Sequence, residues 1–476
     1  MDDLNINQAQ STSRESFSGR LGFILVTAAC AIGLGNIWRF PYIVGQYGGA
    51  YFVLIYLFFL VVLGLPLLVM ELSVGRASRA SIAGSFEKLE GKHRAWHLNK
   101  YWMLSGNYFL LSFYTVVTGW IISYFVGFCQ GEFAGMTREM AGAQFGALLQ
   151  NSSEQIYMTM LAIGVSILVC AFGLKRGVER IIKIMMVLLF LFLVILAVHS
   201  LMMKNAAEGL KYYLLPNWQA LVDAGFGRVI FAAMGQAFFT LGIGVGSIQI
   251  FGSYTSKNRS LCHEAVWITM LDTGVALMAG LIIFPACLSF GLHPDSGPGL
   301  LFVTMTNIFG SMPLGQFWGS FFFFLMTLAA VSTLIAVFEN IIAIVMELFR
   351  LRRLTSVVIN AVIIAAISLP CIYGFNEWNI YGFNEWKSFT PFGPGSVVLD
   401  LEDFILTNNI LPLGALVYVL FCTIKWGWGW NNFYKEANAG AGLKLSSSLS
   451  VYMKYILPLL IIFIYVFGYL DKFFTN

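Results

Sequence analysis

Residues 28–36 read Ala-Ala-Cys-Ala-Ile-Gly-Leu-Gly-Asn, in the middle of an apolar run that extends from residue 18 to residue 45. Inside a membrane, backbone without helical hydrogen bonds is tolerated only where it is buried in protein or lines a cavity. The two glycines and the asparagine therefore indicate a broken membrane helix with a binding site at the break. A second break, 242–246, reads Gly-Ile-Gly-Val-Gly. Two interrupted apolar segments in matching places of two halves are typical of secondary transporters.

The composition is that of an integral membrane protein. Of the 476 residues, 58% are hydrophobic and 11% are charged, whereas soluble domains carry about 25% charged residues. We expect a single transmembrane domain over 1–476, built as an all-α polytopic bundle in a lipid bilayer. The polar start, 1–13, lacks the basic segment and cleavage site of a signal peptide, so we expect the first apolar run to remain in the mature protein.

Several kinds of chemistry find no support in the sequence. The seven cysteines and five histidines are scattered without the spacing of metal ligands. No Gly-x-x-x-x-Gly-Lys-Ser/Thr motif occurs, and no nucleophile–base pair stands out. We therefore expect no enzyme activity, no organic cofactor, no ATP and no nucleic-acid partner. Transport would have to use an ion gradient.

The apolar runs predict eleven transmembrane helices, since a span needs about 20 mostly apolar residues. They are 18–45, 50–74, 101–128, 157–173, 181–203, 226–254, 263–291, 314–349, 355–373, 397–424 and 451–470. Most Lys and Arg fall on one side of these spans, whereas 292–313 contains none. The positive-inside rule then places the N-terminus in the cytoplasm and the C-terminus outside. The tandem repeat in 373–388 is expected to be a tolerated duplication in an outer loop.

Oxygen atoms near the breaks suggest ion sites. Freed carbonyls and the negative ends of half-helices favour cations, and Asn36 adds a side-chain oxygen. In the eighth span, Ser332 and Thr333 lie one turn after Ala329. Such neutral oxygens suit a weakly held monovalent ion rather than calcium or magnesium. Two plainer interpretations stay open: the glycines would allow close helix packing, and the hydroxyls would bond the carbonyl one turn back.

Acidic and aromatic residues inside spans are further candidates. Asp272 lies well inside the seventh span, where an ionisable group costs about 2.5–3.5 kcal/mol and is a functional candidate by default; a cavity-facing acid that bonds a neighbouring helix is the alternative. We interpret Glu71 and Glu339 as acids that tie together broken backbone or arginine. Arg39, just beyond the first break, needs a partner, and Asp403 is available.

With these residues in view, the chain resembles the bacterial amino-acid branch of the neurotransmitter:sodium symporter family. The similarity extends over nearly the whole chain. The matching segments are 20–23, 33–42, 46–50, 64–66 with Glu71, 235–241, 298–302 and 329–333. The resemblance implies an inverted five-plus-five repeat with unwound first and sixth spans. The first repeat would cover about 18–203 and the second about 226–424, with an extra helix at 451–470.

The resemblance also implies two sodium sites, with sodium ions as the only cofactor and no organic one. The first would use the Ala31 carbonyl, Asn36, Thr240, Asp272 and the substrate carboxylate. The second would use the carbonyls of Ala29, Ile32 and Ala329 with the hydroxyls of Ser332 and Thr333. Many family members have Asn where Asp272 stands. An acid there would replace the chloride that animal members need, so we expect chloride independence.

An amino acid is the substrate that the resemblance implies. Its carboxylate would meet the amides of Leu34 and Gly35 and the hydroxyl of Tyr114, while Gly33 leaves room where monoamine carriers have Asp. The side-chain pocket would be formed by Leu110, Phe239, Gly242, Val245, Thr333 and Val337. Because Gly242 and Val245 are small, we expect a large hydrophobic or aromatic substrate of the tyrosine or tryptophan type.

Gates and location follow from the same resemblance. Arg39 with Asp403 would close the outside, Phe239 over Tyr114 would form a thin lid, and Arg14 with Glu347 would latch the inside. The chain would work by alternating access in the bacterial inner (plasma) membrane. Two rivals stay open: a proton-coupled amino-acid transporter of the same fold, with Asp272 as proton site, and a receptor or channel without coupled transport.

Overall fold

The two glycine-rich segments break their helices in the structure, a computed structural model that describes residues 16–92, 94–292, 299–375 and 397–474. α1 (Arg20–Ala31) stops where Ile32 turns to an extended conformation, and the chain resumes as a π-helical turn, Gly35–Arg39, leading into α2 (Phe40–Gln46). The two halves are bent by 57°. This is the broken first span that the sequence predicts.

The sixth span is broken over a longer stretch. α12 (Phe226–Phe239) ends before the second glycine-rich segment, and α13 (Gln249–Tyr254) begins after it. Gly242, Gly244 and Gly246 have φ angles of 58°, 108° and 71°, in the left-handed region that only glycine adopts without strain. An added Cβ at Gly244 would lie 2.2 Å from the carbonyl oxygen of Leu411. Both the backbone conformation and the close packing therefore require glycine.

The remaining spans are continuous helices, some with a π-helical turn inside. Nine described helices are long and apolar enough to cross a membrane. Together with the two broken spans, they correspond to the eleven predicted transmembrane helices. These nine are α3–α4 (Ala50–Ser78), α6 with the preceding turn (Trp96–Gln130), α8 (Ser152–Ala171), α9 with its preceding turn (Leu174–Leu201), α14 (Leu261–Ser289), α16 (Gly315–Phe349), α17 (Arg353–Tyr373), α19–α20 (Val398–Thr423) and α22–α23 (Leu449–Phe474).

Several helix ends differ from the predicted bounds. The third span begins at Trp96 rather than 101, and the fifth at Leu174 rather than 181. Both extensions carry polar or charged residues such as Lys100 and Arg176, which an apolar-run criterion excludes but a helix reaching past the hydrocarbon accommodates. The tandem repeat, from residue 376 on, lies outside the described residues, as do Arg14 and Asn476.

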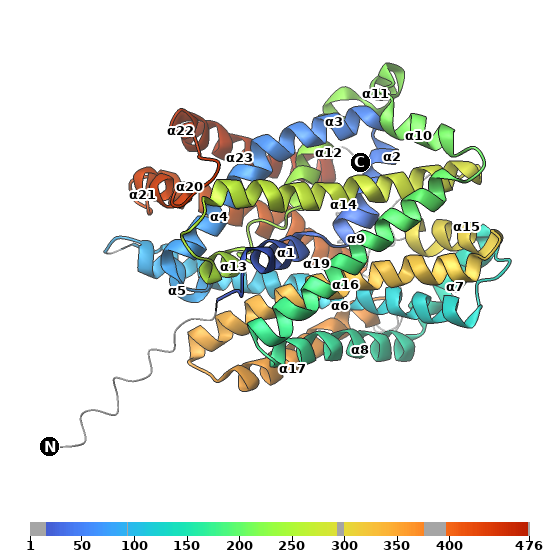
Figure 1. The fold of residues 1–476 in the computed structure, drawn as a ribbon, viewed down its shortest axis with the longest axis horizontal. Helices are drawn as coiled ribbons and strands as arrows, with labels where there is room; N and C mark the ends of the chain where they lie inside the picture. Colours follow the sequence, from blue (N-terminus) through green and yellow to red (C-terminus); the bar gives the residue numbers. More distant parts are fainter. Residues whose placement is uncertain (1–15, 93, 293–298, 376–396, 475–476) are drawn as a thin grey trace.

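Short helices cover the two ends of the bundle (Figure 1). α5 (Ile82–Leu89) and α21 (Trp430–Ala437) lie at one end; α7 (Arg138–Gln150), α10 (Ala206–Leu214), α11 (Trp218–Ala224) and α15 (Thr306–Ser311) lie toward the other. Among the described residues the only bridge between extended segments joins Arg259 and Ala441. α16 and α6 pack against each other in the interior, and α1 packs against α14 and α16, so the first break lies within the bundle.

Candidate ion and substrate site

A buried polar cluster joins the two broken spans to α14. The Asn36 side-chain nitrogen donates to Asp272 Oδ1 at 2.8 Å, to the Asp272 carbonyl oxygen at 3.1 Å and to Thr240 Oγ1 at 3.2 Å. Thr240 Oγ1 donates to Asp272 Oδ2 at 3.0 Å. The Gly33 amide donates to Asn36 Oδ1 at 3.1 Å. The side chains of Asn36, Thr240 and Asp272, all predicted for a first ion site, thus lie together.

The negative charge of the buried Asp272 carboxylate needs a cation or a proton beside it. Asp272 and Asn36 are 0% exposed and Thr240 is 2% exposed. Asn36 and Thr240 donate hydrogen bonds to the Asp272 carboxylate, and both side chains are neutral. A buried carboxylate is stable only if it is paired with a cation, coordinates a metal ion or takes up a proton. The geometry therefore fits a monovalent cation or a proton beside Asp272.

A second cluster of oxygens lies between α1 and α16. The Thr333 hydroxyl lies 3.1 Å from the Ala29 carbonyl oxygen, 2.9 Å from that of Ile32 and 3.1 Å from that of Ala329. The Ser332 hydroxyl donates to the Ala329 carbonyl at 2.9 Å. Both hydroxyls thus bond back along their own helix, as the plainer interpretation holds. Thr333 also reaches the carbonyls of Ala29 and Ile32 at the end of α1, on another helix, which local bonding does not explain.

Between the clusters, the first break presents free backbone to Tyr114 on α6. The Leu34 amide donates to the Tyr114 hydroxyl at 3.2 Å. A Cβ added at Gly33 would lie 2.6 Å from that hydroxyl and 3.0 Å from Thr333 Oγ1, and one at Gly35 would lie 3.1 Å from the Phe239 ring. Larger residues at 33 or 35 would therefore collide with the groups around this backbone.

The residues predicted for a side-chain pocket occupy three neighbouring elements. Val245 and Val337 are buried and Leu110 is half-buried. The Val245 carbonyl accepts from Asn107 Nδ2 at 2.8 Å, which holds the second break against α6. A Cβ built on Gly242 meets no atom within 4 Å. The space beside Gly242 is therefore open, whereas a larger side chain at this position would extend into the predicted side-chain pocket.

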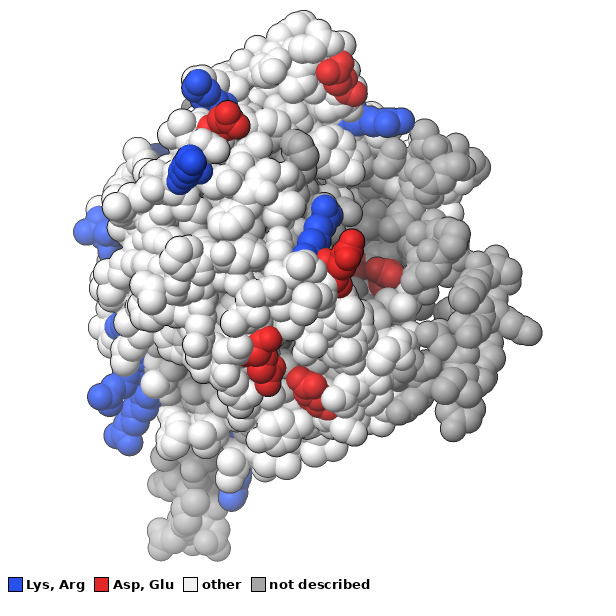
Figure 2. Space-filling view, turned by 90° about the vertical axis from the view of Figure 1, so that its right-hand side faces the viewer, with Lys and Arg blue, Asp and Glu red and all other residues white. Residues whose placement is uncertain are grey.

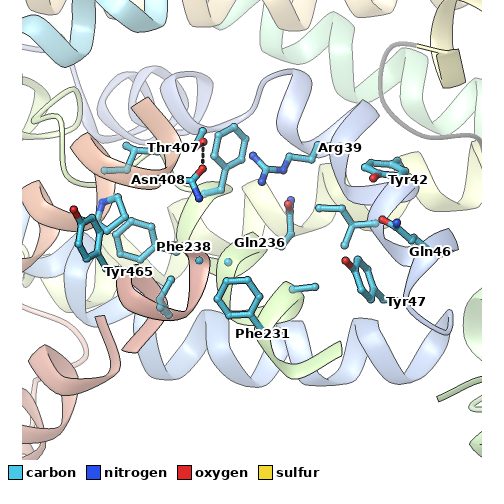
Figure 3. A pocket seen from close by; sticks show the side chains of 18 residues that line it. Arg39, Tyr42, Gln46, Tyr47, Phe231, Gln236, Phe238, Thr407, Asn408 and Tyr465 are labelled. Carbon is cyan, nitrogen blue, oxygen red and sulfur yellow. Dashed lines mark hydrogen bonds between the residues drawn. The ribbon is translucent and has the colours of Figure 1, made fainter. Parts of the chain in front are cut away.

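Phe239 lines a cavity of about 260 Å³. Figure 3 shows this cavity from close by. The Arg39 guanidinium lies 4.0 Å from the centre of the Phe239 ring, and Asp403 interacts with Arg39 electrostatically. Gln236 and Phe231 from α12, Asn408 beyond α19 and Tyr465 from α23 line the cavity. The sequence prediction included Arg39, Asp403 and Phe239 but missed the contribution of α23, whose apolar pattern carries no such signal.

The opposite end of α1 is also held in place. The Phe17 ring packs against Phe23, Phe251 and Tyr254, with centroids 5.8, 6.3 and 6.0 Å away. Ser18 donates through its amide to Glu179 Oε2 at 2.9 Å, a contact that sequence reasoning missed. These contacts fix the start of α1, at the end away from the break.

Glu347, the predicted partner of Arg14, accepts from the Ser81 amide at 2.8 Å, at the start of α5. Because Arg14 lies outside the described residues, the predicted Arg14–Glu347 latch stays a prediction.

Two further buried acids, Glu71 and Glu339, are structural ties, as the sequence predicts. Glu71 on α4 accepts from the amides of Gly244 at 3.0 Å, Ile248 at 3.0 Å and Gln249 at 3.3 Å. Its carboxylate thus replaces helical hydrogen bonds that the second break removes. Glu339 forms an ion pair with Arg353 and accepts from the Tyr254 hydroxyl at 3.2 Å.

The sequence matches the profile described as the Sodium:neurotransmitter symporter family over residues 14–141 and 133–473. The chain belongs to this family. A symporter-family relative in Bacillus subtilis, the uncharacterized sodium-dependent transporter YhdH, is 31% identical over 450 residues, covering 94% of this chain and 96% of its own. An uncharacterized sodium-dependent transporter of Haemophilus influenzae is 31% identical over 466 residues, covering 95% and 98%.

A solved structure of the same fold is that of MhsT in complex with L-phenylalanine, with a TM-score of 0.82 and 36% identity over 95% of this chain and 99% of that one. The predicted fold class of an all-α, multi-pass symporter with broken first and sixth spans is confirmed. The repeat boundaries at 18–203 and 226–424 remain a prediction.

Proposed function

We propose that this symporter takes up an amino acid with two sodium ions by alternating access. The observation that carries the proposal is the pair of oxygen clusters on either side of Gly33–Gly35. One cluster contains Asp272 and the other consists of neutral oxygens around Thr333. The neutral cluster suits a monovalent ion that must be released again. Sodium at both places would hold α1 against α14 and α16 while substrate is bound.

The backbone between the clusters supports a substrate carboxylate as the bound group. The Leu34 and Gly35 amides and the Tyr114 hydroxyl would bind it, and Gly33 leaves room for the carboxylate of an α-amino acid, because no acidic side chain occupies that place. The open space at Gly242 favours a large hydrophobic or aromatic side chain. The relative MhsT binding L-phenylalanine agrees with this class.

Uptake into proteoliposomes tests this function. We expect labelled tyrosine or tryptophan to accumulate when sodium is outside, and not when choline replaces it. Preferred uptake of glycine, alanine or glutamate would overturn the substrate class. Accumulation driven by a pH gradient without sodium would favour the proton-coupled alternative, which the buried Asp272 keeps open. Binding or ion flux without sodium-driven accumulation would favour a receptor or channel.

We further propose that Asp272 makes transport chloride-independent, because its fixed charge balances the sodium ion beside it. Asp272→Asn should convert uptake from chloride-independent to chloride-dependent, roughly tenfold slower in gluconate than in chloride. The buried hydroxyls of Tyr56 and Thr273 lie close to each other and to Thr240, and they would then receive the anion. Uptake rates in the two salts check this. Equal rates of the variant in both salts would contradict it, as would chloride dependence of the unaltered protein.

We also propose that the N-terminus faces the cytoplasm, the C-terminus faces outside, and the membrane is a bacterial inner membrane. The end of the bundle that carries α7, α10 and α15 would be external. Figure 2 shows this face, on which large areas carry no charge and acidic and basic side chains are scattered. The positively charged loops at the other end support the orientation. Labelling of single engineered cysteines in intact cells would test it.

A further inference from the structure

A separate cavity of about 210 Å³ lies at the α7 end of the bundle, away from the oxygen clusters. Three parts of the chain form it: the end of α6, the turn that follows, and the junction of α7 with α8. The lining residues are Ser123, Tyr124, Glu132, Phe133, Gln144, Ala147, Leu148, Asn151 and Glu154. The proposed transport function uses none of them.

The polar atoms that line this cavity are mostly oxygens. Glu132 is exposed and Glu154 is half-buried. Glu154 accepts hydrogen bonds from the Ser123 hydroxyl and, at 3.1 Å, from Asn151 Nδ2. No Lys, Arg, His or Cys is among the described residues that line the cavity. Two carboxylates thus share one cavity without a cationic side chain in its lining.

The Tyr124 hydroxyl supplies a second, independent indication of a ligand. Tyr124 is 2% exposed and lines the cavity, yet within the described residues its hydroxyl has no hydrogen-bond partner. The ring cannot easily turn away, because it stacks on Phe133 with centroids 4.9 Å apart and meets Phe302 edge-on, also at 4.9 Å. A buried hydroxyl without a partner is unfavourable, so a bound group in this cavity would satisfy it.

We propose that this cavity binds a calcium ion. Carboxylate, amide and hydroxyl oxygens are the ligands of hard divalent cations, and the lack of His and Cys argues against zinc. The described residues contain no group of three or more His, Cys, Asp or Glu that could hold a metal, so neutral oxygens and water must complete the shell. The cavity has room for them, since a water needs about 30 Å³. Two carboxylates predict a dissociation constant on the order of 10⁻⁴–10⁻³ M.

Calcium here would fasten the helices of this end together. Glu132 belongs to the turn after α6, and Glu154 to the first turn of α8. The same turn is tied to α15, because the Gly135 amide donates to the Gly310 carbonyl at 2.8 Å and Asn307 Nδ2 to the Met136 carbonyl at 2.8 Å. One ion therefore links α6, α8 and, through the turn, α15.

Purified protein in detergent, at constant sodium and ionic strength, tests the proposal. We expect saturable binding of ⁴⁵Ca²⁺ with one ion per chain, and a rise of the thermal unfolding midpoint with calcium. Glu132→Gln and Glu154→Gln should each raise the dissociation constant at least tenfold, and Tyr124→Phe should raise it severalfold while keeping the ring stack. Glu139→Gln is the matched control, since Glu139 is an exposed acid on α7 that does not line the cavity.

Absence of saturable calcium binding would overturn the proposal, as would unchanged binding in both glutamine variants. A midpoint that rises with putrescine but not with calcium would identify an organic cation site instead and overturn it too. In calcium-free buffer the glutamine variants should have the same thermal unfolding midpoint as the unaltered protein. This result distinguishes a lost ion site from misfolding.

Discussion

Glu71→Ala is expected to abolish sodium-driven uptake and to destabilise the protein strongly. The variant leaves the amides of Gly244, Ile248 and Gln249 without the carboxylate that they share. Each buried donor left unpaired costs about 1–3 kcal/mol, so the three together cost about 3–9 kcal/mol. Because Gly244 lies in the second break and Ile248 and Gln249 follow shortly after it, the loss falls on the segment that carries Gly242 and Val245.

Thermal unfolding in detergent and proteoliposome uptake together check this result. Glu71→Gln keeps one acceptor oxygen and should lie between Glu71→Ala and the unaltered protein. Glu87→Ala removes an exposed acid on neighbouring α5 and should leave both measurements unchanged. Wild-type uptake by Glu71→Ala would show that the second break does not need this support.

Asn36→Ala is expected to eliminate sodium-dependent substrate binding. The Asn36 side chain bonds the Gly33 amide, Thr240 and Asp272 at once. The variant removes a side chain that we propose as an ion ligand, together with the hydrogen bonds that link the two breaks. We expect the sodium concentration for half-maximal binding to rise at least a hundredfold, which corresponds to about 2.8 kcal/mol.

Equilibrium binding of a labelled amino acid over a range of sodium concentrations measures this effect. Asn432→Ala, an exposed position on α21, is the control. Binding at unchanged sodium concentration would refute the ligand role of Asn36 and point to packing as the reason for the Gly33–Asn36 sequence.

The breaks and their oxygen clusters were predictable because their signals are local in sequence. Glycines next to Asn36, and adjacent hydroxyls one turn after Ala329, are visible in a short window. The role of Glu71 also followed, since a buried acid must find donors and a broken helix offers them. The exact partners, Gly244, Ile248 and Gln249, did not follow, because they depend on how α4 packs against α13.

Other features lie beyond a sequence-based argument. The hydrogen bonds from Ser18 to Glu179 join residues 161 positions apart, and the cavity wall formed by Tyr465 depends on how α23 packs. Neither residue type is unusual for its place in the chain. The proposed calcium site is a similar case, because nothing in the sequence distinguishes Glu132 and Glu154 from other acidic residues. Only the fold brings them to one cavity with Tyr124, whose hydroxyl has no hydrogen-bond partner among the described residues.

Thr333 belongs to α16, whereas two of the carbonyls beside it belong to Ala29 of α1 and to Ile32, which directly follows α1. If sodium binds there, α1 cannot swing away from α16 without breaking the ion's coordination shell, and the ion cannot leave while the helices stay together. A sodium ion at Asn36 and Asp272 would likewise hold the first break against α14 until the ion leaves. Inward opening and ion discharge then become a single event. Such a device would limit slippage, the wasteful leak of sodium without substrate that a membrane potential would otherwise drive continuously.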